Sequence, residues 1–305
     1  MGMKILCRAL TGPTGSGKSA LAMRLALEKG WDILCMDSMQ IYRRMDIGTA
    51  KPTKEDRASV RHHLLDIREP DESFSVSEYV EEAEKKIREL NAAGREFLFV
   101  GGTGLYLQAL MHPMGMGNIP ANEALREELN EVALRPGGRK LLHERLAALD
   151  PETAGRLPLN DIRRTIRAIE VSEATGIPFS RQPDRKTDSE YTWKVISTAM
   201  DREILYRRIN ERVEQMIAQG LKDEVATLLR EGVPENAQSM SALGYKEMVP
   251  CVKGLTDLRE AAEEIKTGSR HYAKRQMTFL RREPDIRYID VTQADAYEQI
   301  RQTLS

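Results

Sequence analysis

Eight consecutive residues near the N-terminus have the types and the spacing of a loop that binds phosphate. They are Gly12, Pro13, Thr14, Gly15, Ser16, Gly17, Lys18 and Ser19, and they match the P-loop pattern at every position. The glycines let the backbone turn its N–H groups toward an anion, and Lys18 adds a full positive charge. The hydroxyl of Ser19 is a ligand for magnesium. The stretch therefore predicts binding of a di- or triphosphate.

The flanking residues supply the elements that such a loop needs. The apolar run Ile5–Leu10 predicts a buried strand, and Ala20–Ala26 has helical periodicity. A helix that starts at the loop adds its partial positive charge at the anion. The alternative, a Gly/Ser turn that only starts a helix, is disfavoured because both the spacing and the context fit a P-loop.

A carboxylate that could do chemistry follows the second predicted strand. Trp31–Met36 predicts a second strand that ends at Asp37, at the strand end where ligands of α/β proteins bind. An ordinary P-loop hydrolase places an acid after another buried strand, but Phe97–Val100 is followed by Gly101-Gly102-Thr103. Hydrolases and motors are therefore disfavoured. Asp37 either caps a turn or acts as a general base, in a small-molecule kinase or in a transferase that releases diphosphate.

The remaining pattern predicts an α/β fold with a P-loop NTPase-like parallel sheet. Ser75 and Glu78 have capping-box spacing before a helix that runs to about Asn91. Residues 194–200 form a returning strand. Two helices broken at Gly220, a helix over 256–282, a strand over 286–289 and a helix over 295–304 complete the chain. We expect residues 1–115 and 193–305 to form the core, with residues 116–192 as an all-helical insert.

Composition sets few limits on function. The 305 residues are 41% hydrophobic and 5% aromatic, with a formal net charge of −1. No apolar run is long enough for a membrane span, and the first strand begins too early for a signal peptide. The cysteines Cys7, Cys35 and Cys251 are separated and set among apolar residues, which predicts reduced core thiols. We expect a cytosolic monomer that has no membrane partner.

Seven motifs together resemble those of the tRNA dimethylallyltransferases. They occur in that family's order between about residues 4 and 283: Gly12–Ser19, Asp37-Ser38-Met39-Gln40-Ile41-Tyr42, Gly48-Thr49-Ala50-Lys51-Pro52, His62-His63-Leu64-Leu65-Asp66, Gly101-Gly102-Thr103-Gly104-Leu105-Tyr106, Leu243-Gly244-Tyr245-Lys246-Glu247 and Lys274-Arg275-Gln276-Met277-Thr278. The P-loop alone is generic, whereas the whole series is specific.

The resemblance implies transfer of a dimethylallyl group from its diphosphate to the exocyclic amine of the adenosine 3′ of the tRNA anticodon. It implies Asp37 as the general base and Thr103 as a contact of the transferred group or its diphosphate. Lys18, Mg²⁺ held in part by Ser19, and an arginine near Arg208 or Arg212 would stabilise the leaving group. The target base would have to leave its stack. Because this reaction uses no hydrolytic water, it needs no acid after Phe97–Val100.

An RNA partner is also indicated by charge patterning. Residues 266–282 contain six Lys/Arg and no Asp/Glu, and at helical spacing one face carries Lys266, Arg270, Lys274 and Arg281. An adjacent face carries His271, Arg275 and Arg282. Such a stripe suits phosphates, although a solvated face is the alternative. By resemblance, the tRNA contacts are Asp37, Ser38, Met39, Gln40, Arg126, Arg163, Arg164, Arg167, Gly244, Tyr245, Lys246, Lys274 and Arg275.

Several positions have competing interpretations. Residues 163–167 would suit a kinase lid if the resemblance were set aside, and Gly244-Tyr245 alone could be a turn with a packed ring. His62 and His63 lack a visible third metal ligand, which favours hydrogen-bonded structural histidines. Gly15 replaces a common alanine, Phe279 replaces the usual tryptophan, and no Cys/His pair follows residue 283 as in the zinc finger of eukaryotic relatives. A free-adenine-nucleotide prenylating enzyme is the nearest rival, but it has less need of an arginine-bearing insert and a basic helix.

Overall fold

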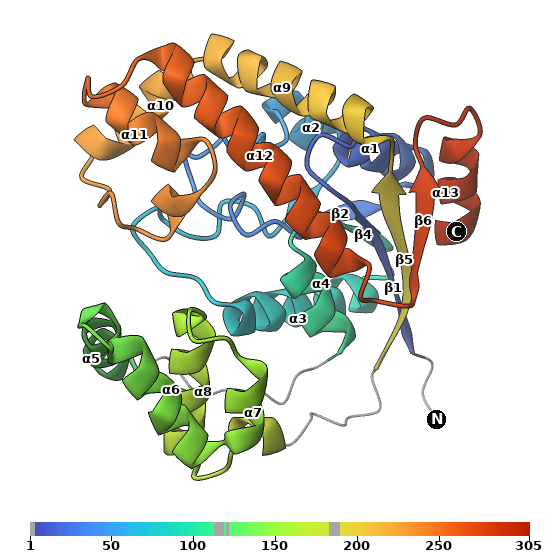
Figure 1. The fold of residues 1–305 in the computed structure, drawn as a ribbon. Coiled ribbons are helices and arrows are strands. Elements are labelled where there is room, and N and C mark those ends of the chain that lie inside the picture. Colours follow the sequence, from blue (N-terminus) through green and yellow to red (C-terminus); the bar gives the residue numbers. More distant parts are fainter. Residues whose placement is uncertain (1–3, 113–118, 120–121, 183–189) are drawn as a thin grey trace. The chain divides into compact units, whose positions relative to one another are not determined.

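The computed structural model describes residues 4–112, 119, 122–182 and 190–305 (Figure 1). Its internal contacts divide the chain into two compact units. Met1–Met111 and Glu190–Ser305 form one, which we call the core unit, and His112–Ser189 forms the other, the helical unit. Among the helices of these described ranges, none combines the length and the apolar character needed to cross a lipid bilayer.

The core unit is built on a six-stranded parallel sheet. Its strands are β1 (Ile5–Thr11), β2 (Asp32–Cys35), β3 (His62–His63), β4 (Phe97–Val100), β5 (Tyr191–Ala199) and β6 (Ile286–Asp290). Their order across the sheet is β3-β2-β4-β1-β5-β6, so β1 lies between β4 and β5. The carboxyl ends of the strands meet at one edge, where parallel sheets bind ligands.

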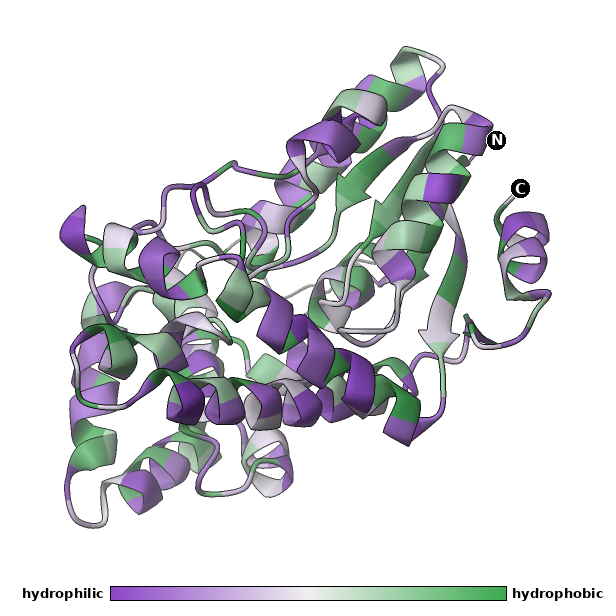
Figure 2. Cartoon of the chain, turned by 90° about the horizontal axis from the view of Figure 1, so that it is seen from above, coloured by the Kyte–Doolittle hydropathy of each residue, from purple (hydrophilic) through white to green (hydrophobic). Residues whose placement is uncertain are grey.

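Helices cover both faces of this sheet (Figure 1). They are α1 (Lys18–Lys29), α2 (Lys54–Ser59), α3 (Val76–Ala92), α4 (Gly104–Met111), α9 (Arg202–Ala218), α10 (Leu221–Arg230), α11 (Tyr245–Val252), α12 (Leu258–Leu280) and α13 (Ala296–Leu304), with a 3₁₀ turn at Ser239–Ser241. Because side chains alternate along a strand, Leu10 packs toward α1 and α13, whereas Cys7 and Ala9 pack toward α3 and α4. Figure 2 shows mostly apolar strands among helices of mixed polarity.

The helical unit has its own apolar core. Its helices are α5 (Glu123–Leu134), α6 (Gly138–Leu149), α7 (Pro151–Arg156) and α8 (Ile162–Thr175), followed by a 3₁₀ turn at Phe179–Arg181. Leu129, Leu142, Leu146 and Ile169 are almost fully buried at its centre. The predicted insert, residues 116–192, includes residues 116–118, 120–121 and 183–189, which lie outside the described residues.

Most predicted elements are confirmed to within a few residues. Ser75 and Glu78 form the predicted capping box, and the break between α9 and α10 falls at Gly220 in a left-handed conformation. The cysteines are buried free thiols, as expected. Sequence patterns did not predict α11, where Pro250 interrupts the helical pattern, or the two-residue strand β3, which is too short to show a period.

Candidate active site

The P-loop connects β1 to α1 at the carboxyl edge of the sheet. Gly17 is the N-cap of α1 and adopts φ 84°, a left-handed conformation that favours glycine. Ser16 is buried and its hydroxyl accepts a hydrogen bond from Thr198 Oγ1 at the end of β5, at 2.7 Å. Lys18 lies over the loop, with its Nζ 3.4 Å from the carbonyl oxygen of Pro13. The loop thus has the shape that the motif predicts.

The ends of β2 and β4 are joined beside the P-loop. Gly101 allows this approach, since a Cβ there would lie 1.9 Å from the carbonyl oxygen of Met36. Thr103 Oγ1 accepts a hydrogen bond from the Ser38 N–H at 3.0 Å, and the Asp37 carboxylate accepts one from the Met39 N–H at 2.9 Å. These bonds bring Asp37 and Thr103, predicted separately from distant motifs, into one turn cluster.

Helix α9 adds positive charge to this edge of the core unit. Ile209 packs against Gly15, and the Nη1 atom of Arg208 lies 3.6 Å from the position that a Cβ on Gly17 would occupy. Burial lowers the pKa of Arg212, and the charge of Asp37 partly opposes that shift. Burial, together with the charge of Arg212, lowers the pKa of Lys18 to about 8.

Neither Arg208 nor Arg212 forms an ion pair within residues 4–112, 119, 122–182 and 190–305. The structure therefore concentrates positive charge at the P-loop, with Asp37 as the carboxylate that acts on Lys18 and Arg212. Such a set attracts a multivalent anion, because burial and the charge of Arg212 disfavour the charged form of Lys18 and a bound anion would favour it. Both arginines that the sequence offered as alternatives are at the site.

Two site residues were not singled out from the sequence. Gln276 on α12 accepts a hydrogen bond from the Thr14 N–H at 2.9 Å and donates one to the Gly102 carbonyl at 2.8 Å. Tyr272, one turn earlier, is partly buried, and burial raises its pKa. Gln276 belongs to the motif Lys274–Thr278. Its position on the helix face opposite Lys274 could have indicated that it points into the protein.

Side-chain hydrogen bonds hold the segment that follows Asp37. The Glu224 carboxylate accepts hydrogen bonds from the N–H groups of Asp46 and Ile47, both at 2.9 Å, and from the Tyr245 hydroxyl at 2.5 Å. Tyr245 is fully buried, so its side chain follows the alternative of a packed ring. The Gln40 amide donates to the carbonyl of Thr49 at 3.0 Å.

The two adjacent histidines are hydrogen-bonded. His63 Nε2 lies 2.8 Å from Asp32 Oδ2, and His62 Nδ1 lies 2.8 Å from the Val60 carbonyl oxygen. Asp32 is buried and also binds Arg95. These contacts fit the structural interpretation of the pair.

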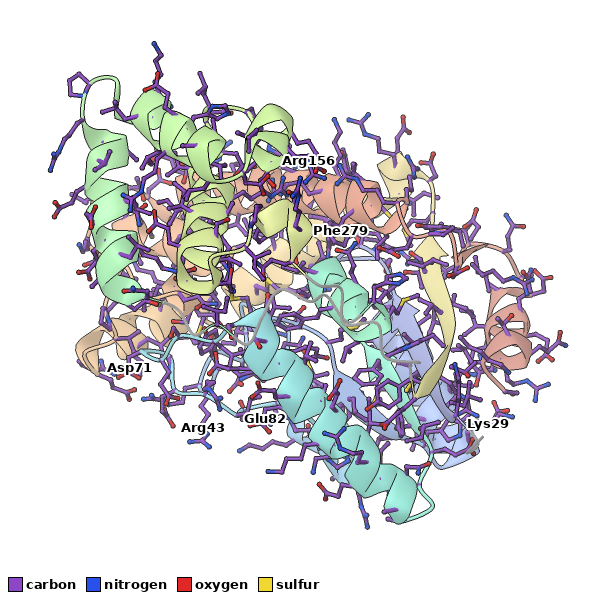
Figure 3. All side chains as sticks on the ribbon, turned by 90° about the horizontal axis from the view of Figure 1, so that it is seen from below. Lys29, Arg43, Asp71, Glu82, Arg156 and Phe279 are labelled. Carbon is purple, nitrogen blue, oxygen red and sulfur yellow. The ribbon has the colours of Figure 1, made fainter. Side chains whose placement is uncertain are left out.

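The basic helix α12 has two different halves. Lys266 pairs with Glu214 and Glu263, and Arg270 donates to Asn210 Oδ1 at 2.8 Å. The first half of the predicted stripe therefore has acceptors within the core unit, and sequence spacing did not show those that lie on α9. Lys274, Arg275, Arg281 and Arg282 are exposed. The side chain of Phe279, labelled in Figure 3, lies against Gly104.

The predicted arginines of the helical unit also differ among themselves. Arg126 and Arg167 bind the two oxygens of Glu170, whose carboxylate is almost fully buried. Burial alone would raise the pKa of Glu170, but the hydrogen bonds from Arg126 and Arg167 outweigh it and hold the pKa below its ordinary value. Arg163 and Arg164 are exposed, with Arg164 3.3 Å from Asp161. Gly244 is buried and Lys246 is exposed.

The sheet, the P-loop and the cations of α9 define an α/β protein of the P-loop class whose phosphate site has a carboxylate after β2 and a glycine turn after β4. Comparison with known proteins narrows this class. The family model described as IPP transferase matches residues 40–283, and the chain belongs to this family.

Relatives and solved structures agree with this assignment. A protein of Geobacillus thermodenitrificans named tRNA dimethylallyltransferase is 44% identical over 289 residues, which is 94% of this chain and 91% of that protein. The structure of a tRNA isopentenylpyrophosphate transferase from Bacillus halodurans is 39% identical, with a TM-score of 0.72 over 98% of this chain and 95% of its own. A eukaryotic dimethylallyltransferase structure, 24% identical with a TM-score of 0.78 over 97% of this chain and 77% of its own, shares the fold.

Proposed function

We propose that this protein transfers the dimethylallyl group of dimethylallyl diphosphate to the exocyclic amine of an adenosine in tRNA and releases diphosphate. The observation that carries the proposal is the site's charge arrangement. A P-loop and the cations of α9 surround the place for an anion. The strand end that holds a metal-ligating acid in hydrolases carries Gly101-Gly102-Thr103 instead. Asp37 is the carboxylate whose charge acts on Lys18 and Arg212.

The proposed reaction breaks a carbon–oxygen bond. The adenine nitrogen attacks the first carbon of the dimethylallyl group, and the diphosphate leaves with the bonding electron pair. The developing negative charge falls on oxygens held by the P-loop amides, Lys18, Arg208 and Arg212. Removing one donor of this kind costs about a hundred- to a thousandfold in rate.

Asp37 would accept the proton that the amine loses. Its carboxylate is fixed by the Met39 N–H, and the neighbouring Ser38 N–H is bound to Thr103 Oγ1. This turn leaves the second carboxylate oxygen free of any hydrogen bond to the described residues. A positioned base of this kind contributes about a hundred- to ten-thousandfold. Thr103 would contact the transferred group or its diphosphate.

Magnesium fits the donors that are present. Ser19 is exposed in the first turn of α1, and within the described residues no group of three His, Cys, Asp or Glu side chains could hold a metal. The ion would therefore take most of its ligands from diphosphate and water, as magnesium commonly does. When bound, it would neutralise charge on the departing diphosphate.

We further propose that the tRNA is bound through its anticodon arm, with the adenosine 3′ of the anticodon as the target. The exposed side chains Lys274 and Arg275 of α12, and Arg163 and Arg164 of α8, would contact RNA phosphates. We expect further RNA contacts from two segments, Asp37 to Gln40 and Gly244 to Lys246. Where their side chains are buried or hydrogen-bonded, these segments would contact the RNA mainly with backbone atoms. Since tRNA is the partner, the cytoplasm is the expected site of action.

The test uses purified protein, magnesium, dimethylallyl diphosphate labelled in the dimethylallyl group and unmodified tRNA, without ATP. A parallel reaction contains AMP in place of tRNA. We expect label in tRNA and none in AMP. Label in AMP alone would make this a free-nucleotide enzyme. Label in neither, with phosphate transfer once ATP is added, would make it a kinase and overturn the proposal.

A further inference from the structure

Gln276 is a buried polar residue at the point where α12 meets two loops of the site. The residue is 6% exposed. Its Oε1 accepts a hydrogen bond from the backbone N–H of Thr14 in the P-loop, at 2.9 Å, and its Nε2 donates to the backbone carbonyl of Gly102, at 2.8 Å. One amide therefore joins the loop after β1 to the loop after β4.

The surroundings are built to fit this amide. A Cβ on Gly102 would lie 2.2 Å from Gln276 Nε2, so the second glycine of the Gly101–Gly104 turn makes room for it. Gly102 is followed by Thr103 in the same turn. Thr103 in turn binds Ser38, the neighbour of Asp37. The contacts form one network from the phosphate loop to the turn that carries Asp37.

Both groups bound by Gln276 would be left without a partner if its amide were removed. Buried backbone groups of this kind cost free energy when unpaired, and a loop relaxes to satisfy them. The Thr14 N–H points at Gln276 and is not available to phosphate, so Gln276 also determines which P-loop amides face the anion. A loop of fixed shape binds an anion without reorganising.

We propose that Gln276 is a positioning residue that fixes the P-loop and the Gly101–Gly104 turn in the geometry that holds diphosphate. The inference rests on the proposed function. It assigns Gln276 no contact with the substrate. Its consequence is that diphosphate affinity depends on an amide that lies on α12, outside the P-loop itself.

The experiment measures binding of inorganic diphosphate with magnesium by calorimetry, which needs no turnover. Gln276→Met keeps the length and removes both hydrogen bonds, and we expect its affinity to fall about tenfold or more. In turnover assays the KM for dimethylallyl diphosphate should rise more than kcat falls. Gln302→Met makes the same chemical change at an exposed position of α13 and should change neither quantity.

Gln276→Glu provides a test that a merely structural role would not pass. An ionised carboxylate faces the Gly102 carbonyl with a lone pair, whereas a protonated carboxyl can donate to that carbonyl and still accept from Thr14. Its diphosphate affinity relative to the wild type should therefore rise as the pH falls from roughly 8 to 5. If the ratio of the Gln276→Glu affinity to the wild-type affinity does not change with pH, the inference is overturned. This test stands even if Gln276→Met fails to fold.

The two proposals fail in different ways. If the wild-type protein binds no diphosphate, the proposed function is overturned and the inference with it. If the wild-type protein binds diphosphate and Gln276→Met binds it equally well, the inference alone is overturned.

Discussion

The arginines beside the P-loop and those of the helical unit differ in their partners. Arg208 and Arg212 have no ion-pairing carboxylate among the described residues. Burial lowers the pKa of Arg212. Arg126 and Arg167 bind the buried carboxylate of Glu170, in the same unit. The first set keeps its charge for a ligand, whereas the second uses much of its charge to hold α5 and α8 together.

The number of arginines in a region therefore does not show where an anion binds. Arg208 is exposed, whereas Arg212 is partly buried and has no acid partner among the described residues, which is costly because burial disfavours its charged form. Such a group is retained where a ligand provides the missing charge, which makes it a functional candidate.

The largest effect is expected at Asp37, the carboxylate of the unpaired set. Asp37→Ala should lower turnover about a hundred- to ten-thousandfold, because the amine loses its proton acceptor. Diphosphate affinity should stay the same or increase, since a negative charge near the anion is removed. Single-turnover rates and calorimetry measure the two quantities. Near-normal turnover would remove Asp37 from the mechanism.

Arg212→Met should lower turnover about a hundred- to a thousandfold through weaker stabilisation of the leaving group. Thermal stability should be unchanged or higher, because a desolvated charge is lost. Arg207→Met, at an exposed position of the same helix, is the control and should keep activity. A variant that lost stability instead of activity would place Arg212 with the structural arginines.

Glu170→Gln tests the paired set. We expect the helical unit to lose about 2 kcal/mol of stability, since two charge-assisted hydrogen bonds to a buried carboxylate are weakened. Faster hydrogen exchange in α5 and α8 would report this loss. Diphosphate affinity should not change. Unchanged exchange together with weaker diphosphate binding would contradict the assigned division of roles.

The contrast recurs within α12. Lys274→Ala with Arg275→Ala should weaken tRNA binding and reduce the slope of log affinity against log salt by about 1 to 2. Lys266→Ala with Arg270→Ala removes the same number of charges from the half that pairs with α9, and it should leave the slope nearly unchanged. Equal effects of the two double variants would show that pairing does not decide RNA contact.

The smallest expected effect is the uptake of protons when diphosphate binds. Lys18 has a pKa of about 8 in the free protein, below the ordinary value of about 10.4, and bound diphosphate favours its charged form. Diphosphate binding should therefore take up a fraction of a proton near roughly pH 8.5 and weaken as the pH rises further. Without ligand, the Lys18 contribution to stability should increase with pH between those two values, because the unfolded chain there holds the extra proton. Calorimetry in buffers of different ionisation enthalpy measures the uptake, and none in the wild type would contradict the assigned pKa.

The sequence was sufficient for local features of the fold. The P-loop, the strand that precedes Asp37 and the capping box at Ser75 each depend on neighbouring residues, and each has the predicted conformation. The family resemblance placed the motifs in order, which local patterns could not do.

Long-range pairing could not be predicted. Lys266 has helical spacing with Lys274, but its partner Glu214 belongs to α9. Gln276 binds Thr14 and Gly102, which are 262 and 174 positions away. No periodicity reports such contacts, because they are set by how α12 packs on the core unit.

The central claim is that the site holds diphosphate as a leaving group. The most direct test uses dimethylallyl diphosphate with oxygen-18 in the bridge between carbon and phosphorus, together with unmodified tRNA, and weighs the released product by mass spectrometry. We expect the heavy oxygen to leave entirely in diphosphate, because the carbon–oxygen bond breaks. Heavy oxygen retained by the dimethylallyl product would mean that a phosphorus–oxygen bond breaks, and it would contradict the account.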